Sequence, residues 1–161
     1  SYLTTTPYIL FIDADVRFFS NTVIYDTLKQ MKEENLHLIG LNIKCYDSDL
    51  MAQLSFSIFN TLNKILSKWI PFAVGAYLLT RKDKFYEHGK FPCKYPTSED
   101  FHLSRKYDPK KFKIAKHYFG QDSRRFKKMG YLGMSVYLIK NFLFKDNYNY
   151  WNNIDEKRYW S

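Results

Sequence analysis

The stretch Tyr8-Ile9-Leu10-Phe11-Ile12-Asp13-Ala14-Asp15 gives the first indication of the fold. Its first five residues form a continuous apolar run, which is typical of a strand covered on both faces in a parallel sheet. The run ends at Asp13 and Asp15, and ligands of open α/β sheets bind just beyond the carboxyl ends of strands. Two such carboxylates can hold one hard divalent ion whose other ligands come from a phosphate. An ordinary acidic loop is the structural alternative.

Strands and helices alternate along the rest of the chain. Apolar runs predict further strands at 36–43, 72–80 and 112–115, and periodicity and capping residues predict helices at 21–34, 49–69, 81–88 and 98–107. The 49–69 segment is amphipathic, because its apolar residues recur at steps of three and four: Met51, Leu54, Ile58, Leu62, Ile65 and Trp69. Residues 147–161 are only weakly helical. This alternation predicts an α/β fold with a mainly parallel sheet.

Composition is consistent with one folded domain or part of a larger one. The 161 residues are 45% hydrophobic and 25% charged, and no stretch resembles a signal peptide. Two cysteines, Cys45 and Cys93, cannot build a disulfide framework or a zinc cage, so we expect a reducing compartment. The net charge of +9 arises entirely from residues 102–161, which favours a phosphate-bearing ligand, a polyanion or an anionic membrane as partner.

Two further clusters carry groups suited to chemistry. Ser98-Glu99-Asp100 opens a helix, where acidic residues either cap the helix or supply a general base. Gln121-Asp122-Ser123-Arg124-Arg125 precedes two lysines, and the planar guanidinium groups suit phosphate oxygens. A solvated basic surface is the alternative for the second cluster.

These clusters, in this order, resemble the family 2 glycosyltransferases, which have the GT-A fold. The resemblance runs from about Tyr8 to Gly130 and leaves roughly 85 residues between the two acidic pairs. Its other elements are Val74-Gly75-Ala76-Tyr77-Leu78-Leu79, Gly89-Lys90-Phe91 and the Gln-x-x-Arg-Arg of residues 121–125. It implies a partial GT-A (Rossmann-like) domain in residues 1–128, followed by an apolar and aromatic helical extension in 129–161.

The resemblance also implies an activity, namely inverting transfer of a sugar from a nucleotide-diphosphate sugar to an acceptor hydroxyl or lipid phosphate. Asp13 and Asp15 would then bind Mg²⁺ or Mn²⁺ on the donor diphosphate. Asp100 would deprotonate the acceptor, Glu99 would orient it, and Gly75 and Ala76 would line its site. The remaining matched residues would grip the diphosphate: Gln121, Arg124 and Arg125. Saccharides or lipid-linked acceptors are the expected partners, and nucleic acid is not.

The chain departs from the family pattern at three places. Arg125 stands where processive members carry Trp, and Arg17 stands where the dolichol-phosphate-mannose synthase group usually carries Gln. The strands that bind the nucleotide in this family precede the Asp-x-Asp by most of a hundred residues. They are missing from this sequence, so we expect the chain to be inactive alone.

The segment 129–144 is apolar and about 16 residues long, short of the roughly 20 that span a bilayer. Its flanking lysines suit an anionic interface, while a helix packed on the domain is the alternative. We therefore expect a cytoplasmic protein that can dock peripherally on the cytosolic face of a membrane.

Two other functions are consistent with parts of the sequence. A haloacid-dehalogenase-like phosphatase also places Asp-x-Asp after an apolar strand, but usually has Thr where this chain has Arg17. A basic nucleic-acid-binding module would use the aromatic residues among the C-terminal lysines and arginines. That alternative leaves the acidic pairs without a role.

Overall fold

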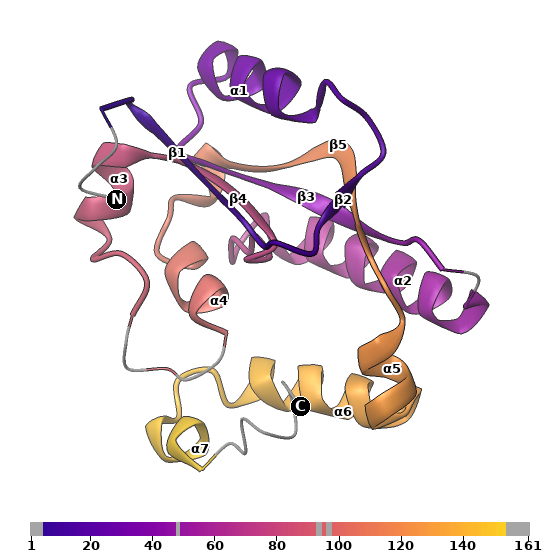
Figure 1. The fold of residues 1–161 in the computed structure, drawn as a ribbon. Helices are drawn as coiled ribbons and strands as arrows, with labels where there is room; N and C mark the ends of the chain where they lie inside the picture. Colours follow the sequence, from indigo (N-terminus) through magenta and orange to yellow (C-terminus); the bar gives the residue numbers. More distant parts are fainter. Residues whose placement is uncertain (1–4, 48, 93–94, 96–97, 154–161) are drawn as a thin grey trace.

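The computed structural model describes residues 5–47, 49–92, 95 and 98–153, and a curled five-stranded sheet lies at its centre (Figure 1). The strands run in the spatial order β1-β4-β3-β5-β2. Among these strands only β3 and β5 pair in parallel, and the other neighbours are antiparallel. The sheet is therefore mixed, and the prediction of a mainly parallel sheet is wrong. Its strands are β1 (Tyr8–Ile12), β2 (Arg17–Phe18), β3 (Leu38–Cys45), β4 (Tyr77–Arg81) and β5 (Phe112–Gln121).

The apolar run that indicated a parallel strand forms an edge strand. β1 pairs with β4 alone, antiparallel, from Tyr8 opposite Arg81 to Ile12 opposite Tyr77. Of its five residues only Ile9 is buried. The strand that is covered on both faces is β3, whose residues from Leu38 to Leu41 are all buried at the middle of the sheet. Continuous hydrophobicity thus located strands correctly without specifying their direction.

Helices cover both faces of the sheet. α1 lies on one face, while α2 and α4 lie on the other, with α5, α6 and α7 beyond them (Figure 1). A 3₁₀ turn at Pro109–Lys111 leads into β5. The helices are α1 (Val23–Glu33), α2 (Leu50–Leu66), α3 (Lys82–Glu87), α4 (Glu99–Ser104), α5 (Arg124–Met129), α6 (Tyr131–Leu143) and α7 (Tyr148–Asn152).

Two predicted strands have different bounds in the structure. β4 begins at Tyr77, so Gly75 and Ala76 form a turn before the strand rather than part of it. β5 continues past Ala115 to Gln121, which places the first residue of the basic cluster at the end of the sheet. Both differences bring candidate site residues to strand termini. Residues 93, 97 and 154–161 lie outside the described part of the chain.

The inward side of the helix α2 carries both apolar and amide side chains. Ala52, Phe56 and Asn63 are its buried residues. The Asn60 side chain accepts a hydrogen bond from the Ile43 amide at 2.9 Å and donates one to the Ile43 carbonyl at 2.7 Å. β4 pairs with β3 only between Leu38 and Gly40, so Asn60 satisfies backbone groups that lie beyond that pairing. The apolar stripe of this amphipathic helix consequently faces outward.

Candidate functional site

The Asp-x-Asp pair lies in the loop between β1 and β2. The Asp13 amide donates a hydrogen bond to the Ala76 carbonyl at 3.4 Å, which joins the end of β1 to the turn before β4. Partial burial and the neighbouring Asp15 carboxylate raise the pKa of Asp13, and Arg125 opposes that rise. Two mutually repelling carboxylates beside a guanidinium group form a site that gains from a bound cation.

Asp100 lies in the first turn of α4, and backbone amides contact both of its oxygens. Oδ2 accepts a hydrogen bond from the Gly75 amide at 2.6 Å, and Oδ1 accepts one from the Phe101 amide at 2.7 Å. Burial raises the pKa of Asp100 to about 6; the two amides oppose this rise, and the charges of Glu99 and Asp13 add to it. A carboxyl group with a pKa near 6 is well matched to accept a proton near neutral pH.

Helix capping alone does not account for Asp100. Gly75 precedes it by 25 residues and belongs to the turn before β4, so the carboxylate connects two separate segments. Ser98, at the N-cap position, has a left-handed φ of 61° and makes no capping hydrogen bond with its side chain. The buried Ala76 joins this turn to Asp13 from the other side. The two predicted acidic pairs therefore meet around one turn, with Glu99 at the first position of α4.

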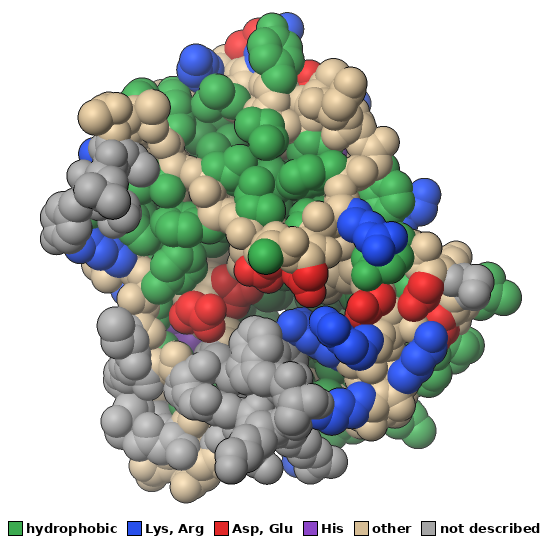
Figure 2. Space-filling view, in the orientation of Figure 1, with side chains coloured by type: hydrophobic (Ala, Val, Ile, Leu, Met, Phe, Trp, Pro, Cys, Tyr) green, Lys and Arg blue, Asp and Glu red, His purple; other side chains and the backbone are tan. Residues whose placement is uncertain are grey.

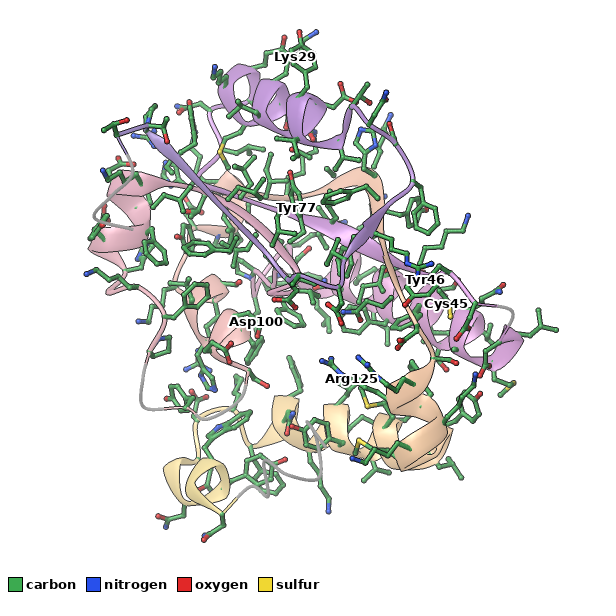
Figure 3. All side chains as sticks on the ribbon, viewed as in Figure 1. Lys29, Cys45, Tyr46, Tyr77, Asp100 and Arg125 are labelled. Atoms are coloured by element: carbon green, nitrogen blue, oxygen red, sulfur yellow. The ribbon has the colours of Figure 1, made fainter. Side chains whose placement is uncertain are left out.

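The basic cluster lies next to these acids. Gln121 ends β5, and Arg124 and Arg125 begin α5. An Arg124 Nη atom is 3.6 Å from an Asp15 carboxylate oxygen, and its Nε is 4.0 Å from Asp122. Figure 2 shows acidic side chains meeting a group of Lys and Arg side chains near the centre of this face. Asp100 on α4 and Arg125 on α5 lie on the same side of the sheet (Figure 3).

A small pocket lies within this cluster. Its volume of about 30 Å³ has room for roughly one water molecule and is too small for a diphosphate. For a diphosphate to bind here, the arginine side chains that line the pocket would have to move. The lining residues are Asp15, Tyr46, Phe56, Gln121, Asp122, Arg124, Arg125 and Phe126.

Residues after β3 position the basic helix α5. Asp47 Oδ2 accepts hydrogen bonds from the Ser123 amide at 3.0 Å and the Ser123 hydroxyl at 2.7 Å. The Cys45 thiol donates to Asp47 Oδ1 at 2.9 Å. These bonds hold the pKa of Asp47 well below its ordinary value, while burial and Asp47 raise the pKa of Cys45 to about 11. The carboxylate thereby fixes the residue immediately before Arg124.

The sequence analysis did not identify Tyr46 and Asp47 as site residues. Tyr46 lines the pocket, and the Arg17 guanidinium lies 4.1 Å from the centre of its ring. A signal was present, because these residues follow β3 in the chain as Asp13 and Asp15 follow β1. Polar residues at two strand ends are candidates for one shared edge site.

The donor set fits a divalent ion whose coordination a ligand completes. Within the part of the chain that the structure describes, no three His, Cys, Asp or Glu side chains cluster as a complete metal site. Mg²⁺ commonly binds through one or two carboxylates together with substrate phosphates and water. Asp13 and Asp15 supply that number, and the neighbouring arginines suit the phosphates.

Comparison with known proteins supports the fold. No protein-family model and no curated protein sequence matches this chain. Among solved structures, the chain is similar to the mannosyltransferase PcManGT from Pyrobaculum calidifontis in complex with GDP-Man and Mn²⁺, with a TM-score of 0.56 and 14% sequence identity. The chain shares a glycosyltransferase fold. The similarity covers 84% of this chain and 40% of the mannosyltransferase chain, so the chain spans less than half of that relative's length.

Proposed function

We propose that this chain is part of a metal-dependent glycosyltransferase of family 2 that moves a sugar from a nucleotide-diphosphate sugar to an acceptor hydroxyl or lipid phosphate. The observation that carries the proposal is the turn at Gly75 and Ala76, which contacts the Asp100 carboxylate and the Asp13 amide in a fold shared with a glycosyltransferase, while the charge of Arg125 acts on Asp13. The solved relative holds GDP-Man and Mn²⁺, which supports a nucleotide sugar and Mg²⁺ or Mn²⁺ as ligands.

Asp13 and Asp15 would hold the divalent ion. When bound, the ion supplies positive charge that neutralises the departing diphosphate. The hydrogen bond that the Asp13 amide donates to the Ala76 carbonyl fixes the start of the loop that carries both carboxylates. Burial and then repulsion from Asp15 raise the pKa of Asp13, and a cation would relieve that repulsion.

Asp100 would be the general base of an inverting reaction. The acceptor oxygen would attack the anomeric carbon as the bond from that carbon to the diphosphate breaks, and the acceptor proton would pass to Asp100. Two backbone amides fix the orientation of the carboxylate. Glu99, next to it, would orient the acceptor, and the turn at Gly75 and Ala76 would line the acceptor side.

Gln121, Arg124 and Arg125 would contact the donor diphosphate. Arg124 pairs with Asp15 across the small pocket. A diphosphate would replace the Asp15 carboxylate as the partner of this guanidinium group, because phosphate offers several acceptor oxygens to its planar donors. The same movement would open the pocket for the ligand.

This chain corresponds to only part of the mannosyltransferase structure, which limits what the chain can do by itself. Since the chain spans 40% of that structure, we propose that the nucleotide is held mainly by further elements and that residues 1–161 alone do not transfer sugar. Residues 1–128 would belong to the catalytic domain, with 129–161 as its helical extension. The shared glycosyltransferase fold favours this function over a dehalogenase-like phosphatase or a nucleic-acid-binding module.

The test separates ligand binding from turnover. The chain alone should bind Mn²⁺ together with pyrophosphate in a titration followed by electron paramagnetic resonance, and Asp13→Asn should weaken this binding by about tenfold or more. The complete protein should consume a nucleotide sugar from a panel that includes GDP-mannose, and Asp100→Asn should abolish consumption while Mn²⁺–pyrophosphate binding persists. Consumption that is unaffected by both substitutions would contradict the proposal.

A further inference from the structure

An apolar stripe runs along the outward face of α2, and another runs along the outward face of α6. In α2 the outward stripe comprises Met51, Leu54, Ile58, Leu62 and Ile65, and Trp69 continues it beyond the helix with 67% of its surface exposed. In α6 the stripe comprises Leu132, Val136, Ile139 and Leu143. Single exposed apolar side chains are common on proteins, but two continuous helical stripes are not.

The two stripes belong to neighbouring helices whose other sides are fixed. α2 and α6 contact each other, and the Tyr131 hydroxyl at the start of α6 donates to Asp49, the N-cap residue of α2, at 2.5 Å. Met134 of α6 and Phe56 of α2 belong to the same buried core cluster. The inward sides of both helices therefore already pack within the chain. Only the exposed stripes are available to a partner outside it. We call them the apolar stripes of α2 and α6.

The charges beside these stripes have one sign. α2 contains a single charged residue, Lys64, and α6 contains a single one, Lys140. Lys68 follows α2 directly. Among the residues that the structure describes, these three lysines form no ion pair. Apolar helical faces that carry lysines without an acidic partner are typical of helices that lie in an anionic lipid interface.

The charge also argues against a second copy of the chain as the partner. A symmetric contact between two such faces would bring the lysines of both copies, Lys64, Lys68 and Lys140, into one interface, and like charges within an interface oppose association. Anionic headgroups instead attract all three. Within the described part of the chain, no helix has both the length and the apolarity to cross a bilayer.

We propose that the apolar stripes of α2 and α6 bind the surface of an anionic membrane, with the helices parallel to it and their lysines on the headgroups. Trp69 would lie at the level of the headgroups, where an indole ring keeps its apolar body in the lipid and its N–H in contact with water. This proposal does not depend on sugar transfer.

The test is sedimentation of the full chain with vesicles of phosphatidylcholine alone and of phosphatidylcholine mixed with phosphatidylglycerol. We expect binding to the mixed vesicles that weakens with added salt, and little binding to phosphatidylcholine. Ile58→Glu and Ile139→Glu should each lower the partition coefficient by about tenfold, because each removes apolar contact and adds repulsion. Lys64→Gln should lower it by about fivefold on the anionic vesicles only.

The matched control is Ile24→Glu on α1, which covers the opposite face of the sheet (Figure 1). Ile24 and Ile58 have similar exposure, 46% and 52%, so the two substitutions disturb the fold to a similar extent. Ile24→Glu should leave vesicle binding unchanged. In a Trp160→Phe background, tryptophan emission should shift to shorter wavelength on binding, and Trp69→Phe should remove most of that shift because Trp151 is buried.

Four results would overturn the proposal. One is the absence of binding to the mixed vesicles, and another is an equal loss of binding in the Ile24→Glu control. The third is a dimer in sedimentation equilibrium without lipid that Ile58→Glu dissociates, which would assign the stripes to a second copy. If the complete protein binds vesicles and is insensitive to both Ile58→Glu and Ile139→Glu, its own remaining segments cover the stripes, and the membrane assignment is wrong.

Discussion

The Gly75 amide donates to Asp100 Oδ2 at 2.6 Å, and a Cβ placed on Gly75 would approach the same oxygen to 3.3 Å. The absence of a side chain at residue 75 therefore lets the turn before β4 come close to the carboxylate. The same turn holds Asp13 through the Ala76 carbonyl. One glycine-containing turn thus determines where both acidic groups of the proposed active site lie.

Gly75→Ala should impair sugar transfer more than it impairs folding. The added methyl group must displace the Asp100 carboxylate by a few tenths of an ångström, and small displacements of a catalytic group are costly. We expect kcat of the complete protein to fall by about tenfold or more with the melting temperature nearly unchanged. Gly133→Ala is the matched control, because its Cβ would meet only Met129, at 3.9 Å, and should leave kcat unaltered. If Gly75→Ala and Gly133→Ala have equal kcat values, Gly75 does not position the proposed active site.

The pH dependence of transfer should report Asp100. Since burial raises its pKa from 3.8 to about 6, a general base at this position is lost as the pH falls through 6. We expect kcat of the complete protein to fall tenfold per pH unit below that value and to level off above it. Asp100→Asn should lower kcat by at least about a hundredfold on the plateau above pH 6, and the difference from wild type should shrink as the pH falls below 6. A profile that is flat between pH 5 and 8 would argue against Asp100 as the base.

The stability of the chain should have the opposite pH dependence at this residue. The folded state binds the Asp100 proton more tightly than the unfolded state does, so this contribution to stability is complete below pH 3.8 and is lost as the pH rises through about 6. Asp100→Asn should therefore flatten the melting temperature between pH 4 and 7, as measured by circular dichroism. If the melting temperatures of the wild type and of Asp100→Asn change with pH in the same way, the Asp100 carboxyl is not desolvated.

Local sequence patterns predicted the elements well and their arrangement poorly. The strand ending at Ile12 and the helix after Asp49 are where the sequence placed them. Strand direction was wrong for β1, because an apolar run indicates a strand and contains nothing about its neighbour. The sequence pattern likewise did not indicate which side of α2 faces the sheet. Asn60 faces inward because it satisfies backbone groups of Ile43, a need that arises only because the pairing of β3 with β4 ends at Gly40.

The candidate site shows the same division. The end of a predicted strand identified Asp13 and Asp15 as candidates, and the affinity of guanidinium groups for phosphate identified the basic cluster. The bond between Gly75 and Asp100 joins segments 25 residues apart, and the bonds from Ser123 to Asp47 join segments 76 apart. Contacts over such distances depend on tertiary packing, which local patterns do not encode. The role of Asp47 in positioning α5 was consequently missed.

Arg124 should have opposite effects on metal and donor binding. Its guanidinium lies 3.6 Å from Asp15 and competes with a cation for that carboxylate. Arg124→Gln should tighten Mn²⁺ binding to the chain without other ligands by about twofold to fivefold, a modest effect because the pair is exposed. It should weaken Mn²⁺-dependent pyrophosphate binding by about tenfold, through loss of the planar donors. Arg124→Lys should retain the competition and lose most of the diphosphate affinity. Changes of the same sign in both titrations would contradict the proposed exchange of partners.

Asp47 should hold α5 in place in a way that depends on pH. Its carboxylate accepts from the Ser123 amide and hydroxyl, and these bonds keep its pKa well below the ordinary value. Its stabilising contribution is therefore present above the ordinary aspartate pKa and is lost as the pH falls below about 4. Asp47→Asn should lower the melting temperature at pH 7 by several degrees, and the difference from wild type should shrink in acid. Hydrogen exchange of the α5 amides should accelerate in the variant. Asp83→Asn, which removes an exposed pair with Arg81, is the control and should change neither measurement appreciably. If the two variants behave alike, Asp47 is an ordinary surface carboxylate and α5 is held by its apolar contacts.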